Sequence, residues 1–330
     1  MAMIQLNALR LNAVDANIIA LDGVRRRGSH TGAPPVVPDV PDIPEEPDVP
    51  TNPDVDENGY IIFADAEVQR ICAENWGNGI GITSSQAAAV TTLARVFVAN
   101  TSITSFNELV YFTGLDSLHN SSESYNYGTF RGCVNLINVT LPSSIKSLGE
   151  ASFAACDSLR TIGDMTNVEL IGARCFDSSP LEGFKVKLSS LLNIGYGAFY
   201  NTQIDAVVDL GGLTTLPDGV YIGGKTRGVF GSCTQLRVAI LPSTITTVGT
   251  VAFEKCSNLS GIVIKATTPP ALNNTNAFNS TNNCLIYVPD ASVEAYKTAT
   301  NWSSYASRIF PVSQLATNNP ELYAEIEEYL

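Results

Sequence analysis

The chain has 330 residues, of which 45% are hydrophobic and 15% charged, so it is long and apolar enough to bury a sizeable core. Its 19 basic residues stand against 32 acidic ones, and the net charge of −13 argues against nucleic acid as a partner, since phosphate binding needs a basic surface. No stretch approaches the roughly 18 apolar residues of a membrane span, and polar residues interrupt the N-terminal stretch, so neither membrane insertion nor a signal peptide is predicted.

Residues 1–33 form an apolar arm that is too short to bury a core of its own. Apolar and polar residues alternate in two short runs, as in strands, at Ile4 and Leu6 and at Leu9 and Leu11. A segment of this kind gains stability by pairing with the sheet edge of another chain. We therefore expect residues 1–33 to anchor the protein to a larger assembly such as a capsid, a tail or a cell surface.

The next segment, residues 34–57, has a proline at every third position from Pro35 to Pro53 and carries eight acidic residues without a basic one. Because polyproline II has three residues per turn, these prolines form one face of a stiff linker that could span roughly 75 Å. Another face is mostly aliphatic. The pattern predicts a spacer and leaves two alternatives, a linker free in solvent or one packed on a partner or on sister chains in a homo-oligomer.

Residues 58–128 are predicted to form a small helical N-terminal cap. Apolar residues at positions 68, 71 and 72 follow Asp65, a suitable N-cap, at helical spacing. A second helix is predicted to begin at Ser85 and to run through Leu93.

Two shorter motifs lie within the same segment. Ser105 and Glu108 have the spacing of a capping box, which predicts a further helix start. The loop of residues 77–83 joins the two predicted helices and contains no carboxylate. Because calcium needs several carboxylate ligands, no metal site is predicted in this loop.

A unit of 23 residues repeats from Thr129 onward, with one longer interval of 31 residues. Its most regular member is a phenylalanine, found at Phe130, Phe153, Phe176, Phe199, Phe230 and Phe253. Counted from these phenylalanines, cysteine recurs at +3, leucine at +6 and glycine at +19. Such a unit can bury its apolar residues only against the units before and after it, which predicts a repeat solenoid over residues 129–289.

The solenoid is predicted to contain short β-strands, as around residues 139–141, with irregular turns between them. The six phenylalanines are its predicted core, and the cysteines at +3 are predicted to be packing residues rather than metal or redox groups. Ser179 and Thr202 replace cysteine in the third and fourth units, where we expect a less regular ladder.

The repeats resemble the BspA-like leucine-rich-repeat family of bacterial surface proteins in residues 129–136 (TFRGCVNL) and 229–236 (VFGSCTQL). The resemblance covers about residues 58–315, and residues 286–290 with Tyr296 and Trp302 are similar to the C-terminal end of that family. It implies a leucine-rich-repeat fold and adhesion to proteins or glycans, with no catalytic residues.

Residues 290–315 are predicted to close the C-terminal end, and residues 316–330 to form an acidic amphipathic tail. Asn319 can cap a helix that begins at Pro320. One face of that helix then carries Leu322, Ile326, Tyr329 and Leu330. We expect a short helix over residues 321–330 that packs on an apolar surface.

The run Gly219 to Thr226 (GVYIGGKT) matches the phosphate-loop pattern letter for letter. That loop binds phosphate only when a helix follows it, and the three residues between Thr226 and Phe230 leave no room for one. The run instead lies in the interval that grows from 23 to 31 residues. We predict a surface hairpin turned at Gly223 and Gly224.

The sequence offers few residues for general acid–base catalysis, because its two histidines, His30 and His119, have no partner at any motif spacing. No catalytic residue and no cofactor is predicted. Function on a solenoid usually lies on exposed faces or insertions, where tyrosine and arginine are favoured contacts. The candidate ligand contacts are therefore Tyr221, Lys225 and Arg227 in the insertion, and Tyr125 and Tyr127 in the loop 119–127.

These features predict a non-enzymatic recognition module on a stalk, anchored by residues 1–33 and binding a host-surface protein or glycan through the repeats. The order of arm, linker and repeats favours a bacteriophage fibre or decoration protein on the virion surface. The alternative is a bacterial cell-surface leucine-rich-repeat adhesin, which the family resemblance favours. A nucleotide-binding enzyme that uses residues 219–226 ranks third.

Overall fold

Short parallel strands and brief helical turns make up the described part of the chain, which covers residues 53–118 and 128–330 of a computed structural model. The predicted arm lies outside the described residues, as do the predicted linker up to residue 52 and the loop 119–127 with Tyr125 and Tyr127. All described residues belong to one compact unit, Pro50–Leu330.

The strands are short, as expected for turns of a repeat. They are β1 (Ser105–Phe106), β2 (Ser117–Leu118), β3 (Asn138–Val139), β4 (Ser147–Leu148), β5 (Leu170–Ile171), β6 (Lys185–Lys187), β7 (Asn193–Ile194), β8 (Ala206–Asp209), β9 (Thr215–Leu216), β10 (Val220–Ile222), β11 (Lys225–Arg227), β12 (Val238–Leu241), β13 (Thr247–Val248), β14 (Gly261–Ile264), β15 (Ala271–Leu272), β16 (Leu285–Val288) and β17 (Ile309–Pro311). The α-helices are α2 (Ala66–Trp76), α3 (Ser84–Ala88), α4 (Val293–Thr298), α5 (Leu315–Asn318) and α6 (Pro320–Ile326). The 3-10 helices are η1 (Asn107–Tyr111), η2 (Thr275–Phe278), η3 (Asp290–Ser292), η4 (Trp302–Arg308), η5 (Val312–Gln314) and η6 (Glu327–Tyr329).

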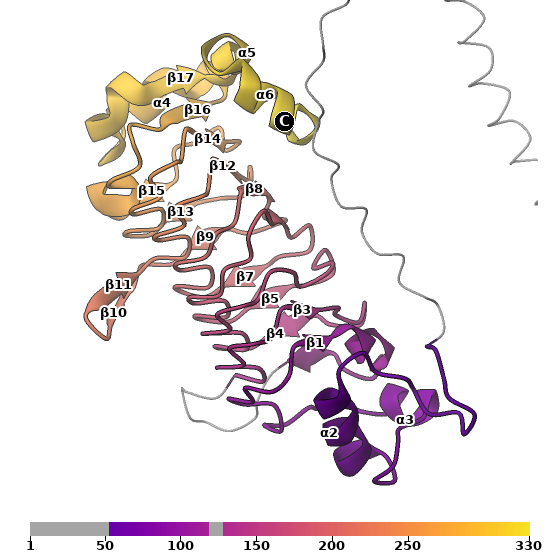
Figure 1. Cartoon of the computed structure of the whole chain (residues 1–330). Helices are drawn as coiled ribbons and strands as arrows, with labels where there is room; N and C mark the ends of the chain where they lie inside the picture. The colour runs from indigo at the N-terminus through magenta and orange to yellow at the C-terminus, as the bar shows by residue number, and fades with distance from the viewer. Residues whose placement is uncertain (1–52, 119–127) are drawn as a thin grey trace, which may run out of the picture. The chain divides into compact units, whose positions relative to one another are not determined.

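The repeat strands pair in parallel along two lines, and Figure 1 shows them following one another through the repeats. One line is a six-stranded sheet in the order β17-β16-β14-β12-β8-β6, in which Val238 pairs with Gly261 and Gly261 with Leu285. The other line forms the sheets β2-β4-β5-β7 and β15-β13-β9. The repeat pattern predicted the first line and missed the second, because strands of two residues show no alternation.

A continuous stack of phenylalanine rings occupies the core of the repeats. The rings of Phe130, Phe153, Phe176, Phe199, Phe230, Phe253 and Phe278 follow one another with centroids 5.2 to 5.8 Å apart and planes inclined by 8° to 21°. Each of these rings is buried. The backbone reinforces the stack, since the N–H of Phe153 donates to the carbonyl of Cys175 in the next unit at 2.8 Å. The 23-residue period therefore corresponds to one layer of the stack.

In the four units that have a cysteine at +3, its thiol bonds to a phenylalanine carbonyl earlier in the chain. Cys156 Sγ donates to the carbonyl of Phe130 at 3.1 Å, and three other thiols do the same at 3.0 Å, those of Cys133, Cys233 and Cys256. Each buried phenylalanine carbonyl thereby gains a donor that the strand ladders do not supply.

The two units without this cysteine behave differently from each other. Ser179 Oγ donates to Phe153 O in the same way, so the less regular ladder predicted there is wrong. Thr202 Oγ1 turns back to Phe199 O of its own unit at 3.0 Å, so the prediction holds at Thr202. A hydroxyl on an unbranched side chain can therefore replace the thiol.

The recurrent glycine at +19 marks close contact between the backbones of successive units. A Cβ atom at Gly172 would lie 2.5 Å from Glu150 N, and one at Gly195 would lie 2.3 Å from Ala173 N. No real Cβ approaches a backbone atom so closely, so any larger residue would force the two units apart.

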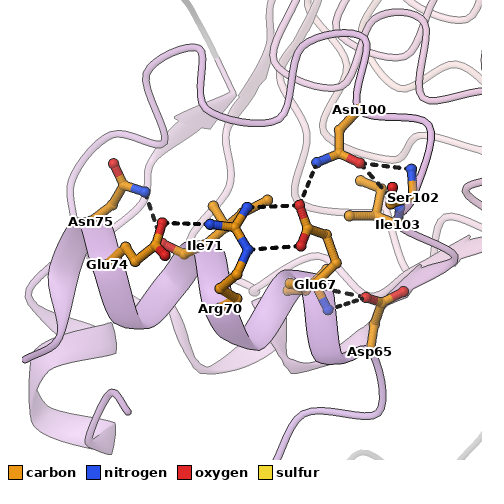
Figure 2. A network of polar contacts seen from close by, with 10 residues as sticks. Asp65, Glu67, Arg70, Ile71, Glu74, Asn75, Asn100, Ser102 and Ile103 are labelled. Carbon is orange, nitrogen blue, oxygen red and sulfur yellow. Dashed lines mark hydrogen bonds and ion pairs between the residues drawn. The ribbon is translucent and has the colours of Figure 1, made fainter. Parts of the chain in front are cut away.

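Helix α2 begins at a carboxylate that serves two segments. Asp65 Oδ1 accepts from the N–H groups of the first turn, as its predicted N-cap role requires. Its Oδ2 accepts from Thr104 N at 2.6 Å and Thr104 Oγ1 at 2.8 Å, which ties the helix start to the residue before β1. Figure 2 shows the network along this helix, in which the Arg70 guanidinium bridges Glu67 and Glu74.

The second predicted helix is shorter than expected and begins elsewhere. Thr83, not Ser85, is the N-cap of α3, because Thr83 and Gln86 satisfy each other's backbone N–H groups in a complete capping box. The helix ends at Ala88, and Leu93 is buried in an irregular segment.

The predicted capping box at Ser105 is also wrong. Ser105 lies in β1, and the following 3-10 helix η1 has no side-chain cap. Glu108 Oε1 instead accepts from Ala64 N at 3.0 Å. This tertiary partner, distant in sequence, takes the place of the local one.

The C-terminal helix α6 covers the outer face of the six-stranded sheet. Asn319 Oδ1 accepts from Leu322 N at 3.2 Å, and Pro320 is the first helical residue, as predicted. Leu322 and Ile326 are buried in a second apolar cluster with Ala206, Val208, Val238, Ile240, Val263, Tyr287 and Leu315. The α-helix ends at Ile326, earlier than predicted, and a 3-10 turn follows.

Candidate recognition surface

The eight-residue insertion folds into a hairpin that projects from the repeats (Figure 1). Strands β10 and β11 pair antiparallel, with Tyr221 opposite Thr226 and Ile222 opposite Lys225. The two residues of the turn, Gly223 and Gly224, have φ of 58° and 81°. Two left-handed residues in a two-residue loop are the signature of a type I′ turn, which favours glycine at both positions. The hairpin predicted at these glycines is confirmed.

The hairpin also shows that residues 219–226 lack the geometry of a phosphate-binding loop. The lysine and threonine of the motif, Lys225 and Thr226, lie in β11 instead of at the start of a helix. A tight turn of two glycines presents no row of N–H groups toward a phosphate, and no helix N-terminus follows it. Residues 219–226 therefore match the sequence pattern but do not form the strand–loop–helix structure of a phosphate loop.

Arg227, at the end of β11, holds the hairpin against an earlier unit. Its Nε donates to Asp177 Oδ2 at 2.8 Å, and its guanidinium lies over the Tyr200 ring, 5.3 Å from the centroid. Its Nη1 also donates to the carbonyl of Ile222 within the hairpin. The side chain is only 14% exposed. This candidate ligand contact is thus placed as an internal brace.

Asp177 is the centre of a small buried charge cluster. Its Oδ2 accepts from Arg174 Nε at 2.9 Å as well as from Arg227, and its side chain is 4% exposed. Buried carboxylates need partners of this kind, because an unpaired charge is costly away from water. Glu150 lies near the same cluster, where burial raises its pKa and the neighbouring Arg174 opposes that shift.

Tyr221 and Lys225 remain on the solvent side of the hairpin. Tyr221 is 72% exposed, and Lys225 and the adjoining Val220 are also exposed. No described residue accepts a hydrogen bond from the Tyr221 hydroxyl or forms an ion pair with Lys225. Of the three candidate contacts in the insertion, Arg227 is bonded within the protein, while Tyr221 and Lys225 are exposed to solvent.

The sequence patterns missed Asp177 and Tyr200, which position the hairpin. Asp177 lies 50 residues before its partner Arg227, and its place one residue after a repeat phenylalanine is filled by unrelated residues in the other units. The close approach at the hairpin base was also missed, where a Cβ at Gly228 would lie 1.9 Å from Val251 O. Neither feature leaves a local pattern.

The model of the BspA type leucine-rich repeat region matches six copies in this chain, over residues 100–227 and 214–308. These matches cover the layers whose phenylalanines stack in the core. The chain belongs to the BspA-type leucine-rich repeat family. As a member of this family it is a leucine-rich repeat protein with many short parallel strands, as the period of the sequence predicted.

Several solved bacterial repeat proteins are similar to this BspA-type chain. A leucine-rich repeat protein from Bacteroides ovatus is 22% identical, with a TM-score of 0.35, over 54% of this chain and 44% of that one. A leucine-rich repeat protein of T. pallidum is 22% identical, with a TM-score of 0.31, over 48% and 59%. A leucine-rich cell surface protein from Faecalibacterium prausnitzii is 15% identical, with a TM-score of 0.25, over 67% and 82%. The chain thus spans less than two thirds of the first two, and no curated protein matches it.

The cysteines of this BspA-type chain are placed as core residues. All seven are free and buried. Burial raises the pKa of the Cys156 and Cys175 thiols, which keeps them protonated and poorly nucleophilic. Within residues 53–118 and 128–330, no three His, Cys, Asp or Glu side chains gather as a metal site would require, and no helix there is long and apolar enough to cross a membrane.

Proposed function

We propose that this protein is a non-enzymatic recognition module that binds a protein or glycan of a cell surface through the β10–β11 hairpin. One observation supports this proposal above others. A ribbon inserted into an otherwise regular repeat exposes Tyr221 at its surface, while the buried Arg227–Asp177 pair holds its base. Such a ribbon loses little entropy on binding because it is already ordered.

The chemistry of the exposed residues fits this role. Tyrosine supplies a large, rigid contact with a polar end and is enriched among the residues that dominate interface energies. Lys225 adds a cation at the same ribbon, which suits a partner with an acidic or polar surface. Leucine-rich repeat proteins are generally binding modules, and nothing in the hairpin resembles a nucleotide site.

The proposal treats residues 129–289 as one solenoid whose two ends are covered. Residues 58–128 are proposed as the N-terminal cap, since Phe97 lies 5.2 Å from Phe130, centroid to centroid, and continues its core. Residues 290–315 are proposed as the C-terminal cap. There Tyr296 Oη donates to Ala266 O at 2.8 Å and Trp302 Nε1 to Pro270 O at 2.7 Å, which joins the cap to the last units.

We place the module on the bacterial cell surface, because membership of the BspA-type family supports that site better than the virion expected from the order of segments. The virion placement relies on the arm, residues 1–33, which lies outside the described residues. Anchoring through that arm stays part of the proposal in either setting. Protease treatment of intact producing cells tests the placement, since a surface protein is cleaved without lysis and a virion protein sediments with particles.

Binding of the labelled full-length protein to target cells tests the hairpin. Tyr221→Ala should weaken binding by about tenfold or more, the loss typical of a central aromatic contact. Leu192→Ala is the matched control, because Leu192 is also exposed, at 64%, but lies outside the hairpin. Equal binding of wild type and Tyr221→Ala would remove the hairpin from the proposal.

A further inference from the structure

A hollow lies at the C-terminal end of the repeats, between the turn after η2 and the 3-10 helix η4. Its volume is about 450 Å³, within the range of roughly 300–1,000 Å³ found for small-molecule sites. Its lining is rich in amides and hydroxyls, those of Thr275, Asn279, Ser280, Thr281, Asn282, Asn283, Ser304 and Ser307, together with Phe278, Tyr305 and Arg308. Such a lining suits a hydrophilic ligand rather than an apolar one.

Arg308 is held in place without using its hydrogen-bond donors. Its guanidinium lies over the Tyr305 ring, 4.6 Å from the centroid, and the two residues stand three apart in a 3-10 helix, where such positions lie above one another. Tyr305 is itself fixed, because its hydroxyl donates to Thr275 O and its ring packs edge-on against Phe278. A guanidinium held over a ring in this way can still use its N–H groups to bind a ligand.

The polar groups around Arg308 are also uncommitted. Among residues 53–118 and 128–330, the Arg308 guanidinium has no carboxylate partner and donates no hydrogen bond. Six lining side chains likewise make no hydrogen bond to a described residue, those of Asn279, Ser280, Asn282, Asn283, Ser304 and Ser307. One preorganised cation thus stands among several free donors and acceptors.

A different polar hollow in the repeats shows the contrast. It is lined by Glu182 and Asp205, whose carboxylates already pair with Arg160 and Arg237 at 3.2 and 2.6 Å. Its carboxylates are already paired within the protein. Arg308 in the C-terminal hollow has no ion pair with a described residue. The unpaired charge of the C-terminal hollow is therefore available to an anion.

We propose that this hollow binds an acidic saccharide, with the ligand carboxylate on Arg308 and its hydroxyls on the surrounding amides and serines. Arg308 offers the planar pair of donors that matches a carboxylate. The asparagines can both donate to and accept from sugar hydroxyls. This site goes beyond the hairpin function and does not depend on it, since no hairpin residue lines the hollow.

Calorimetric titration of the full-length protein with trigalacturonic acid and 3′-sialyllactose tests the site, with lactose and sodium sulfate as the neutral and small-anion probes. At least one acidic sugar should bind with a Kd at or below about 1 mM. Lactose and sulfate should bind at least about tenfold more weakly, roughly the effect of losing one charge-assisted hydrogen-bonded pair. Arg308→Gln should weaken the acidic sugar about tenfold or more, and Asn282→Ala roughly threefold.

A matched control separates this site from an effect of net charge. Arg160→Gln removes an equal charge from another face and should leave the titration unchanged. No binding of either acidic sugar would overturn the proposal, as would sulfate binding as tightly as the sugars. An equal loss in Arg308→Gln and Arg160→Gln would also overturn it, since net charge alone would then explain the binding. Melting temperatures of all variants show that each is folded.

Discussion

In five of the six repeats the residue at +3 donates a hydrogen bond to the preceding phenylalanine carbonyl, through a thiol or a hydroxyl. The thiol of Cys156 and the hydroxyl of Ser179 both donate to the carbonyl of the phenylalanine in the preceding unit. Ser179 Oγ in addition accepts from Cys156 N at 3.1 Å. A donor to a buried carbonyl is favourable whether it is a thiol or a hydroxyl, so both residue types can serve there.

Replacing Ser179 by alanine should therefore destabilise the repeats more than replacing it by cysteine. Ser179→Ala leaves the carbonyl of Phe153 and the N–H of Cys156 without this partner, which should cost about 1–3 kcal/mol in the free energy of unfolding. Ser179→Cys restores the donor found in four other units and should cost less. Denaturant unfolding of the two variants measures the difference. Equal losses would mean that volume, not hydrogen bonding, determines this position.

The carboxylate of Asp65 makes the stability of the N-terminal segment depend on pH. Burial would raise its pKa, but hydrogen bonds from Thr104 N, Thr104 Oγ1 and the first turn of α2 outweigh burial and lower it below the usual value. A group whose pKa is depressed in the folded state stabilises that state above the unfolded pKa. This contribution disappears as the pH falls through the folded-state pKa.

Asp65→Asn should accordingly be less stable than wild type at pH 7, because asparagine can still cap the helix but carries no charge toward Thr104. The difference should shrink below about pH 4, where the carboxylate of the unfolded chain is protonated, and vanish once that of the folded chain is protonated too. Denaturant unfolding measured from about pH 2 to about pH 7 checks this. Asp157→Asn, at an exposed aspartate, is the matched control.

At the scale of elements, the apolar outer face of the six-stranded sheet explains why the C-terminal helix α6 packs on it. Strands β8, β12 and β14 are apolar on both faces, with Val238 and Ile240 directed away from the phenylalanine core into the cluster under α6. A strand that is apolar on both sides needs a cover on each. The amphipathic pattern of residues 320–330 predicted a helix, and the sheet supplied the surface it packs on.

Ile326→Ala should cost about 2–4 kcal/mol in the free energy of unfolding, the loss expected for a fully buried aliphatic side chain. Glu327→Ala changes the next residue, which is exposed, and should have little effect. Binding of a hydrophobic dye should rise in Ile326→Ala if the helix detaches from the sheet. A loss no larger than that of Glu327→Ala would contradict the packing role of α6.

At the scale of the whole molecule, the folded unit begins slightly before the end of the predicted linker. Val55 forms an antiparallel bridge with Ile61, and Ile62 N donates to Asp54 O at 2.9 Å. Asp56 Oδ1 accepts from Asn58 N at 2.8 Å and closes the turn between them. Residues 54–57 therefore contribute contacts to the unit that follows.

Deletion of residues 1–52 should leave the melting temperature of the remaining chain unchanged, because we expect the arm and linker to serve attachment and not the folding of residues 58–315. Deletion of residues 1–57 is the informative comparison. It removes the bridge at Val55 as well and should lower the melting temperature slightly. Differential scanning calorimetry distinguishes the two. Unfolding of the shorter deletion would show that the arm belongs to the core, against the anchoring role.

The sequence by itself determined the features that are local or periodic. The phenylalanine interval predicted the stacked core, the pair Gly223–Gly224 predicted the hairpin turn, and Asn319 with Pro320 predicted the start of α6. Each depends on neighbouring residues or on a period that adjacent units must share. Such constraints appear directly in the order of residues.

Only the tertiary structure decided which of the candidate contacts are available. Arg227 has the same local context as Lys225, yet a carboxylate 50 residues earlier in the chain makes it a brace while Lys225 stays exposed. The free guanidinium of Arg308 likewise depends on Tyr305, which the carbonyl of Thr275 holds in place from 30 residues away. These pairings arise where insertions and ends break the repeat. There no period applies, and long-range packing alone brings the partners together.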